Sequence, residues 1–160
     1  MKLASGAAPV VKMLYKGLNV GLGTDGPAGS NNDSDLFEEM DLAAKLQKLT
    51  TSDPRALPAR TAVAMATIMG AKALGMDKEI GSLETGKRAD LIAIRLDRPH
   101  AVPMYDVYSQ LVDALKSSDV TDVVVNGRVV VRDAKCLTID AGATIAKAKE
   151  YGLQIAQSVK

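Results

Sequence analysis

Apolar side chains return at helical spacing through the first half of the chain, most clearly after residue 35. In the stretch DLFEEMDLAAKLQKLT they recur every three or four residues, from Leu36 through Met40 as far as Leu49. Asp35 is followed three residues later by Glu38, which is the pattern of a capping box. We therefore expect a helix that begins at Asp35.

Two further helices are predicted on either side of this one. Pro9 favours the start of a short helix that Gly17 ends, because proline suits the first turn and glycine suits the residue after the last turn. The alanine-rich stretch ARTAVAMATIMGAKAL (59–74) predicts a second helix, which Gly75 ends. Gly70 within it has no side chain, and this permits close packing against a neighbouring segment.

The pattern then changes to that of strands. A mostly apolar alternation predicts a strand over 90–96, and VTDVVVNGRVVVRD contains two β-branched runs joined by Asn126 and Gly127. Asn-Gly is the dipeptide that most readily adopts the positive φ angles of a type I′ turn. A hairpin is therefore expected over 120–132.

The remaining segments add one strand and two helices. YDVYSQLVDALK (105–116) favours a helix, and KCLTID (135–140) is a candidate third strand. Asp140 can cap a closing helix over 141–160, whose inner side we expect to carry Ile145, Ala148, Gly152, Ile155 and Val159. The change of period places the boundary between a helical and a β-rich part near residues 75–81.

A short apolar run, NVGLGTDG, ends at Asp25. Residues 20–24 are consistent with a strand buried on both sides, although a run this brief also suits a turn. Taken alone, Thr-Asp-Gly favours a turn, because Asp-Gly is a common turn dipeptide. The glycines also match G-x-G-x-x-G, but the acidic residue expected on a second strand falls in the helical stretch 38–41, which argues against a dinucleotide site.

Composition excludes several classes of partner. The 160 residues suffice for one domain or two small ones, and a net charge of +1 with 47% hydrophobic residues gives no basic excess for nucleic acid. Pro9 and Lys12 interrupt the amino-terminal apolar stretch, so we expect no membrane partner. Cys136 is the only cysteine. We expect it to act as a small hydrophobic residue in a strand, and a single cysteine favours a reducing compartment. We expect a cytoplasmic protein.

Residues able to carry familiar catalytic chemistry are scarce. A catalytic zinc site usually needs about three protein ligands, and His100 is the only histidine. It follows Pro99 in a predicted loop, where we expect an exposed or capping side chain and not a ligand. The serines match no nucleophile-elbow pattern, so nucleophilic catalysis by serine is set aside.

Seven stretches nevertheless match one family in order along essentially the whole chain. They are MKLASGAAPV, NVGLGTDGPAGSNND, LFEEMDLAAKLQK, ATIMGAKALG, GSLETGKRADLIAI, PMYDVYSQLVDAL and VVVNGRVVVRD. The chain resembles the carboxy-terminal part of the metal-dependent amidohydrolases. Within that family it is most similar to the branch of S-adenosylhomocysteine/5′-methylthioadenosine deaminases and related chlorohydrolases.

The resemblance implies an α/β fold. Residues 1–75 would be the last β/α unit and the helices of a (β/α)8 TIM barrel, with NVGLGTD (19–25) as its eighth strand. Residues 76–140 would supply the carboxy-terminal strands of a small composite β-sandwich, and residues 141–160 the closing helix. Because a full barrel takes roughly 250 residues, the other strands would come from sequence ahead of Met1.

The resemblance also assigns chemistry to Asp25. In the family an aspartate at the end of the eighth strand belongs to the metal site. Asp25 is therefore expected to be a metal ligand and the catalytic carboxylate that holds the water activated by a divalent metal, zinc in particular. Ser30 and Asn31 are candidate substrate-binding residues, although roles in the turn and at the helix start are favoured for them. The family's histidines and its acid/base glutamate would lie ahead of Met1.

Two functions are consistent with these observations. In the first, the chain is the carboxy-terminal segment of an amidohydrolase that hydrolyses a C–N bond of an adenosine-type or other N-heterocyclic small molecule, and it is inactive alone. In the second, it is a non-catalytic module that forms a homo-oligomer or joins a separate amino-terminal half of a split enzyme, because a partial barrel exposes apolar faces. Gly29 lengthens the loop relative to many family members, which leaves the substrate open.

Overall fold

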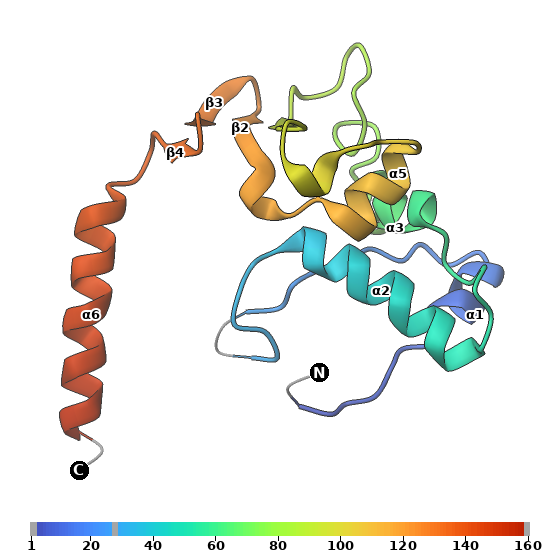
Figure 1. Cartoon of the computed structure of the whole chain (residues 1–160), viewed down its shortest axis with the longest axis horizontal. Helices are drawn as coiled ribbons and strands as arrows, with labels where there is room; N and C mark the ends of the chain where they lie inside the picture. Colours follow the sequence, from blue (N-terminus) through green and yellow to red (C-terminus); the bar gives the residue numbers. More distant parts are fainter. Residues whose placement is uncertain (1–2, 27–28, 159–160) are drawn as a thin grey trace.

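The structure is a computed structural model that describes residues 3–26 and 29–158. Helices dominate the first part of the chain, and a small sheet and a final helix follow (Figure 1). The helices of the first part are α1 (Val10–Tyr15), α2 (Leu36–Thr51), α3 (Ala59–Ala66) and α4 (Ile68–Ala73). The change from helical to strand structure along the chain is as the sequence period predicts.

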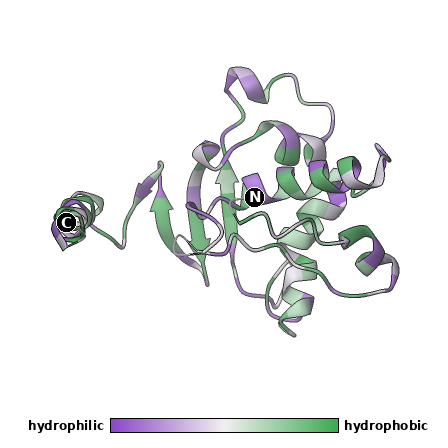
Figure 2. Ribbon diagram, turned by 90° about the horizontal axis from the view of Figure 1, so that it is seen from below, coloured by the Kyte–Doolittle hydropathy of each residue, from purple (hydrophilic) through white to green (hydrophobic). Residues whose placement is uncertain are grey.

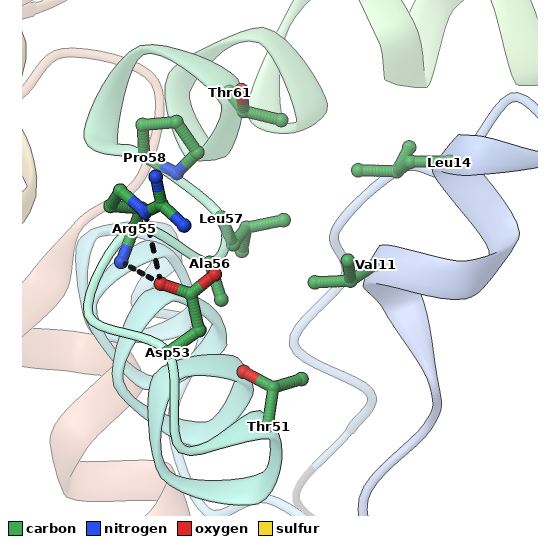
Figure 3. Close-up of a pocket in the computed structure, with 9 residues that line it drawn as sticks. All are labelled: Val11, Leu14, Thr51, Asp53, Arg55, Ala56, Leu57, Pro58 and Thr61. Atoms are coloured by element: carbon green, nitrogen blue, oxygen red, sulfur yellow. Dashed lines mark hydrogen bonds and ion pairs between the residues drawn. The ribbon is translucent and has the colours of Figure 1, made fainter.

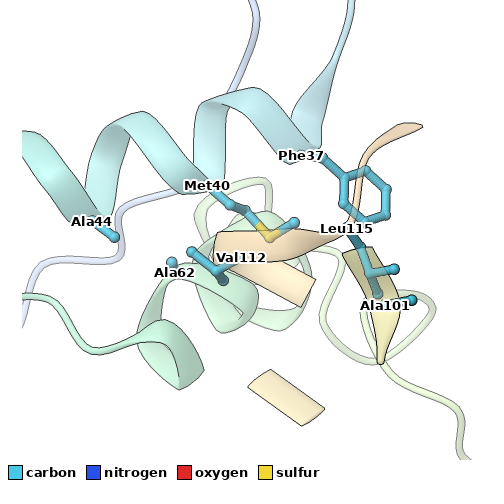
Figure 4. Close-up of a cluster of buried hydrophobic side chains, with 7 residues drawn as sticks. All are labelled: Phe37, Met40, Ala44, Ala62, Ala101, Val112 and Leu115. Atoms are coloured by element: carbon cyan, nitrogen blue, oxygen red, sulfur yellow. The ribbon is translucent and has the colours of Figure 1, made fainter. Parts of the chain in front are cut away.

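The core lies where α2 packs against α3 and against a π-helical turn, η2 (Gln110–Ala114). Three of its side chains come from α2, one comes from α3, and the rest come from residues 101–115 (Figure 4). Together they are Phe37, Met40, Ala44, Ala62, Ala101, Val112 and Leu115. The apolar stripe predicted on α2 is therefore its core face.

The start of α2 is capped by Asp35, as predicted. Its Oδ1 accepts the N–H groups of Phe37 at 2.9 Å and Glu38 at 3.3 Å. The reciprocal half of the predicted capping box is made by a different residue: the N–H of Asp35 donates to Asp33 Oδ1 at 3.2 Å. An aspartate two residues earlier thus takes the role that the spacing predicts for Glu38.

The alanine-rich stretch forms two helices, and the single helix predicted from its pattern is wrong. The break lies at Thr67, whose φ of −130° and ψ of −103° are not helical. In an uninterrupted helix the carbonyl oxygen of Met65 would accept the N–H group four residues later. Here it accepts the N–H of Leu22 at 3.2 Å, so the break connects α3 to the segment that leads to Asp25.

Two glycines pack against each other at the same place. A Cβ at Gly21 would lie 2.9 Å from Cα of Gly70 and 3.8 Å from the Met65 carbonyl oxygen. Both are backbone atoms that cannot move without shifting the helices. The close packing predicted for Gly70 is confirmed, and its partner is the segment that leads to Asp25.

The strand predicted over 20–24 is wrong in this structure. Residues 18–26 form neither helix nor strand. A strand is defined by a hydrogen-bonded neighbour, and Leu22 makes its backbone bond to a helix carbonyl instead. The segment is held by α3 and α4 and not by a sheet.

Four antiparallel strands form one sheet in the order β1-β2-β3-β4. They are β1 (Leu91–Ile94), β2 (Val120–Val125), β3 (Arg128–Arg132) and β4 (Lys135–Cys136). Asn126 and Gly127 join β2 to β3 with φ angles of +49° and +77°, as a type I′ turn requires, so the predicted hairpin is confirmed. The predicted third strand over 135–140 contains only the two residues of β4.

Cys136 pairs with Val131 in the sheet, but its side chain is exposed and is not packed as a small hydrophobic residue. Its sulfur lies 3.4 Å from Thr138 Oγ1. This hydrogen bond to the Thr138 side chain is the main reason why the pKa of the thiol is lowered.

The helix predicted over 105–116 is present in an irregular form. It begins as α5 (Val107–Ser109), continues as η2, and is flanked by the 3-10 turns η1 (Pro99–Ala101) and η3 (Ser117–Asp119). Asp106 caps it by accepting the N–H of Ser109 at 2.7 Å. The N–H of Leu115 donates to the Gln110 carbonyl at 2.9 Å, which is the five-residue spacing of a π-turn.

The final helix, α6 (Ala141–Ser158), stands apart from the rest of the chain in Figure 1 and in Figure 2. All its described residues are exposed. The predicted inner side is therefore wrong for Ile145, Ala148, Gly152 and Ile155, while Val159 lies outside the described residues. Among residues 3–26 and 29–158, no helix is both long and apolar enough to cross a membrane.

Candidate active site

Asp25 ends the segment that Leu22 and Gly21 fasten to the helices. Its backbone has a φ of +58°, in the left-handed region that non-glycine residues seldom adopt. The Asp25 side chain is exposed, and the Thr24 hydroxyl donates to the Asp25 carbonyl at 3.1 Å. A fixed segment and an unusual turn thus present this carboxylate at the surface.

The loop after Asp25 supplies hydrogen bonds to both carboxylate oxygens. Oδ1 accepts the N–H of Gly26 at 2.8 Å. Oδ2 accepts the backbone N–H of Ser30 at 3.0 Å and the Ser30 hydroxyl at 2.7 Å. Ser30, predicted as a candidate substrate-binding residue, therefore contacts the predicted catalytic carboxylate directly.

The carboxylate borders a cavity of about 300 Å³. Asp25, Ser30 and Asn31 line it together, so all three residues singled out in the sequence meet at one place. The cavity is also lined by residues 3–6 and by Glu38, Glu39 and Leu42 from the first turns of α2.

Asn31 ties the loop to α2. Its Nδ2 donates to Glu39 Oε1 at 2.7 Å, and its Oδ1 accepts the N–H of Asn32 at 2.8 Å. The cavity is acidic, and the negative charge of Asp33 is the main reason why the pKa of Glu38 is raised. The favoured role of Asn31 in the loop and at the helix start agrees with these bonds.

Sequence reasoning did not single out Glu38 and Glu39 as cavity residues. One signal was available: both lie in the first turn of the helix that follows the Asp25 loop, and the start of such a helix lies beside the end of the preceding segment. The glutamates also suit a helix start electrostatically. Their place in the cavity follows from this geometry.

The described residues do not fit a complete zinc site. No group of three or more His, Cys, Asp or Glu side chains in the described part of the chain is placed to hold a metal ion, whereas zinc is bound by about four ligands. His100 lies elsewhere, with Nε2 2.8 Å from Oδ2 of the buried Asp119 and a side chain that is 45% exposed.

A second cavity, of about 320 Å³, lies at the other end of α2 (Figure 3). Val11 and Leu14 of α1 face the turn between α2 and α3 across it. Asp53 and Arg55 form an ion pair at its edge, and the backbone N–H of Arg55 is the main reason why the pKa of Asp53 is lowered. None of the predicted site residues lines this cavity.

Comparison with known proteins identifies the family. Residues 1–130 match the amidohydrolase family. The chain therefore belongs to the amidohydrolase family, as its sequence stretches indicate.

Three related proteins show how far the similarity extends. The 5-methylthioadenosine/S-adenosylhomocysteine deaminase of Thermodesulfovibrio yellowstonii is 49% identical over 158 residues, which are 99% of this chain and 36% of that protein. A zinc-bound adenosine deaminase from Xanthomonas campestris superposes with a TM-score of 0.94 at 39% identity, over 98% of this chain and 35% of that one. The chain thus spans about a third of the length of these relatives.

An atrazine chlorohydrolase from Arthrobacter aurescens, complexed with zinc, also has this fold. It superposes with a TM-score of 0.81 at 34% identity, over 91% of this chain and 32% of that one. The resemblance to both deaminases and chlorohydrolases is therefore confirmed, and the structure is a partial amidohydrolase fold.

Proposed function

We propose that this chain forms the carboxy-terminal part of a deaminase active site, in which Asp25 is the catalytic carboxylate. The observation that carries the proposal is the fixed Asp25 carboxylate on a cavity that Ser30 and Asn31 share. Similarity to deaminases of adenosine-type compounds supports this substrate class. Residues 1–75 would then be the barrel part, 76–140 strands of the β-sandwich and 141–160 the closing helix.

Hydrolytic deamination replaces an amino group on the ring by an oxygen from water, and ammonia leaves. The attacking water must lose a proton, and the leaving amine must gain one. We propose that Asp25 accepts the proton of the water, because an ionised carboxylate next to the reacting atoms can act as a general base. Substrate would enter the cavity that Asp25 borders, with Ser30 and Asn31 on the same wall.

Asp25 would also be this chain's single contribution to a divalent metal site. Zinc is the candidate, because the two related structures contain it. The remaining ligands would have to come from histidines that this chain does not have, since His100 is its only one. We therefore expect the chain alone to bind zinc weakly and to be inactive. Metal analysis and a deaminase assay test this, and stoichiometric zinc with turnover in the isolated chain would contradict it.

A hybrid enzyme tests the function directly. The aligned third of the Thermodesulfovibrio yellowstonii deaminase is replaced by this chain, and deamination of adenosine and 5′-methylthioadenosine is followed by ultraviolet absorbance. We expect an active hybrid and a loss of at least about 100-fold in kcat for Asp25→Asn, since general base catalysis is removed. Asp133→Asn, in an exposed turn of the β-hairpin region, is the matched control. A folded but inactive hybrid would refute the proposal.

A second candidate is a self-associating module, and the exposed apolar side chains of α6 favour it. Ile145 is 56% exposed, Leu153 67% and Ile155 63%. An apolar helix face of this kind is stabilised by a partner. Light scattering during size-exclusion chromatography tests the self-associating module against the first proposal, because a monomer at all concentrations would contradict self-association.

A further inference from the structure

Ser30 places two hydrogen-bond donors on one oxygen of Asp25. Its backbone N–H and its hydroxyl both reach Oδ2, at 3.0 Å and 2.7 Å. We propose that Ser30 is a positioning residue, which fixes the rotation of the Asp25 carboxylate for catalysis and does not bind substrate. The effect of Ser30 on catalysis rests on the proposed function. The hydrogen bonds that position Asp25 are within this chain and do not depend on that function.

The rotation of an aspartate carboxylate needs such a restraint. The last side-chain torsion of Asp has a broad energy profile, so the two oxygens are readily displaced. In this loop the N–H of Gly26 donates to Oδ1 at 2.8 Å, and two groups of Ser30, its N–H and its hydroxyl, donate to Oδ2. Donors on both oxygens fix the plane of the carboxylate. A catalytic base must be held close to its productive geometry, because small displacements are costly in rate.

Gly29 fits the same arrangement. A Cβ at this position would lie 2.7 Å from Asp25 Oδ2 and 3.0 Å from Oδ1 and from Cγ. The carboxylate therefore packs directly on the Gly29 backbone, and any side chain there would displace it. The position of the Asp25 carboxylate therefore requires a residue without a side chain at position 29.

The loop is itself held by α2. Asn31, the next residue after Ser30, donates to Glu39 at 2.7 Å. Glu39 is in the first turn of α2, whose following turns pack in the core. Through Asn31, the loop that holds the Asp25 carboxylate is therefore bonded to a helix that supplies three side chains of the core.

The first test uses the 160-residue chain and no activity assay. Amide proton shifts of Gly26 and Ser30 are measured by NMR in the unsubstituted chain and in Asp25→Ala. We expect both signals to move upfield when the carboxylate is removed, because each N–H loses its acceptor. Amides in the sheet serve as the internal control for folding. Unchanged Gly26 and Ser30 shifts in a folded variant would overturn the proposal, whatever the outcome of the hybrid enzyme.

The second test measures kcat and KM in the hybrid enzyme. For Ser30→Ala we expect kcat to fall about 10- to 100-fold, which is the effect of one hydrogen bond to a charged group, and KM to change less than about threefold. Ser30→Thr keeps a hydroxyl and is expected to restore most of kcat. Gly29→Ala is expected to cost about 100-fold or more, since it displaces the base.

Ser117→Ala is the matched control for Ser30→Ala. Its hydroxyl donates to the Asp35 carboxylate at 2.6 Å, so the variant loses the same kind of bond outside the cavity. We expect it to leave kcat unchanged. A Ser30→Ala hybrid that keeps its kcat, or that raises KM alone, would overturn the positioning role and restore substrate binding as the function of Ser30. Circular dichroism establishes that each variant is folded.

Discussion

Two long helices of this chain have similar sequence patterns and opposite environments. α2 has 16 residues and buries Phe37, Met40, Ala44 and Gln47, while α6 has 18 residues and buries none. Both are amphipathic, and both were expected from the same periodicity. A periodic pattern therefore defines a helix and its apolar face, whereas the stability gained from that face depends on the segments that cover it.

The polar contacts of the two helices differ in the same way. Buried Gln47 of α2 accepts the N–H of Val11 at 3.3 Å and donates to the Ala8 carbonyl at 2.9 Å, so it joins distant parts of the chain. In α6 the contacts are local: Lys147 pairs with Glu150 at 2.9 Å and lies over the Tyr151 ring at 4.8 Å. Exposed pairs of this kind contribute only a few tenths of a kcal/mol.

The largest effect is expected from truncation of the α2 face. Met40 is 6% exposed and belongs to the core described above. Met40→Ala should lower the free energy of unfolding by about 2–5 kcal/mol, because it removes buried apolar surface and leaves a cavity. Urea denaturation followed by circular dichroism measures it. Leu49→Ala on the same helix, at a side chain 75% exposed, is the control. Equal effects of the two variants would contradict the assigned core.

The structure confirms the sequence predictions where a local rule determines the geometry. Asn126-Gly127 specified the hairpin, and Asp35 specified the start of α2. The predictions failed where the outcome depends on segments distant in the sequence. The break at Thr67 accompanies the bond from Leu22 to the Met65 carbonyl, and the exposure of α6 depends on what packs against it. Neither can be inferred from periodicity.

In the candidate site, too, some features follow from the sequence and others depend on the folded conformation. Asp25 is predicted as a site residue only through the family resemblance, because Thr-Asp-Gly alone indicates only a turn. The contribution of Gly29 depends on a distance of 2.7 Å to the Asp25 carboxylate, and that of Glu39 on a bond across the loop. Such contacts depend on the conformation of the loop, which no short motif specifies.

An intermediate effect is expected at the junction between the sheet and the core. Asp119 is 4% exposed and accepts hydrogen bonds from His100 at 2.8 Å and from the Lys116 N–H at 2.9 Å. Its pKa is lowered, chiefly by the hydrogen bond with His100. Asp119→Asn should therefore lower the free energy of unfolding at neutral pH by about 1–2 kcal/mol, since it removes charge-assisted bonds.

The pH dependence of this difference follows from the direction of the pKa shift. Because the pKa of Asp119 is lower in the folded chain than in the unfolded chain, its contribution is complete above the unfolded-state pKa and is lost as pH falls through the folded-state pKa. The difference in the free energy of unfolding between the unsubstituted chain and Asp119→Asn should thus become smaller in acid. Asp133→Asn, at an exposed turn, is the control. A gap that widens in acid would contradict the assignment.

The smallest effect is expected on α6. Ile155 is 63% exposed, so Ile155→Ala should change the free energy of unfolding by less than about 0.5 kcal/mol. Alanine has the higher helix propensity, which offsets part of the lost contact area. The measurement is thermal unfolding at two protein concentrations. It is sensitive to association, because a partner that binds only the folded chain makes the midpoint depend on concentration.

This last comparison also tests what covers α6. If a second copy covers the helix, Ile155→Ala should lower the midpoint at high concentration and have little effect at low concentration, since only the associated state buries the side chain. A large decrease of the midpoint at both concentrations would instead mean that α6 packs on its own chain. The conclusion that α2 is buried and α6 is exposed would then be wrong. No effect at either concentration would leave α2 as the only one of the two helices whose apolar face stabilises the isolated chain.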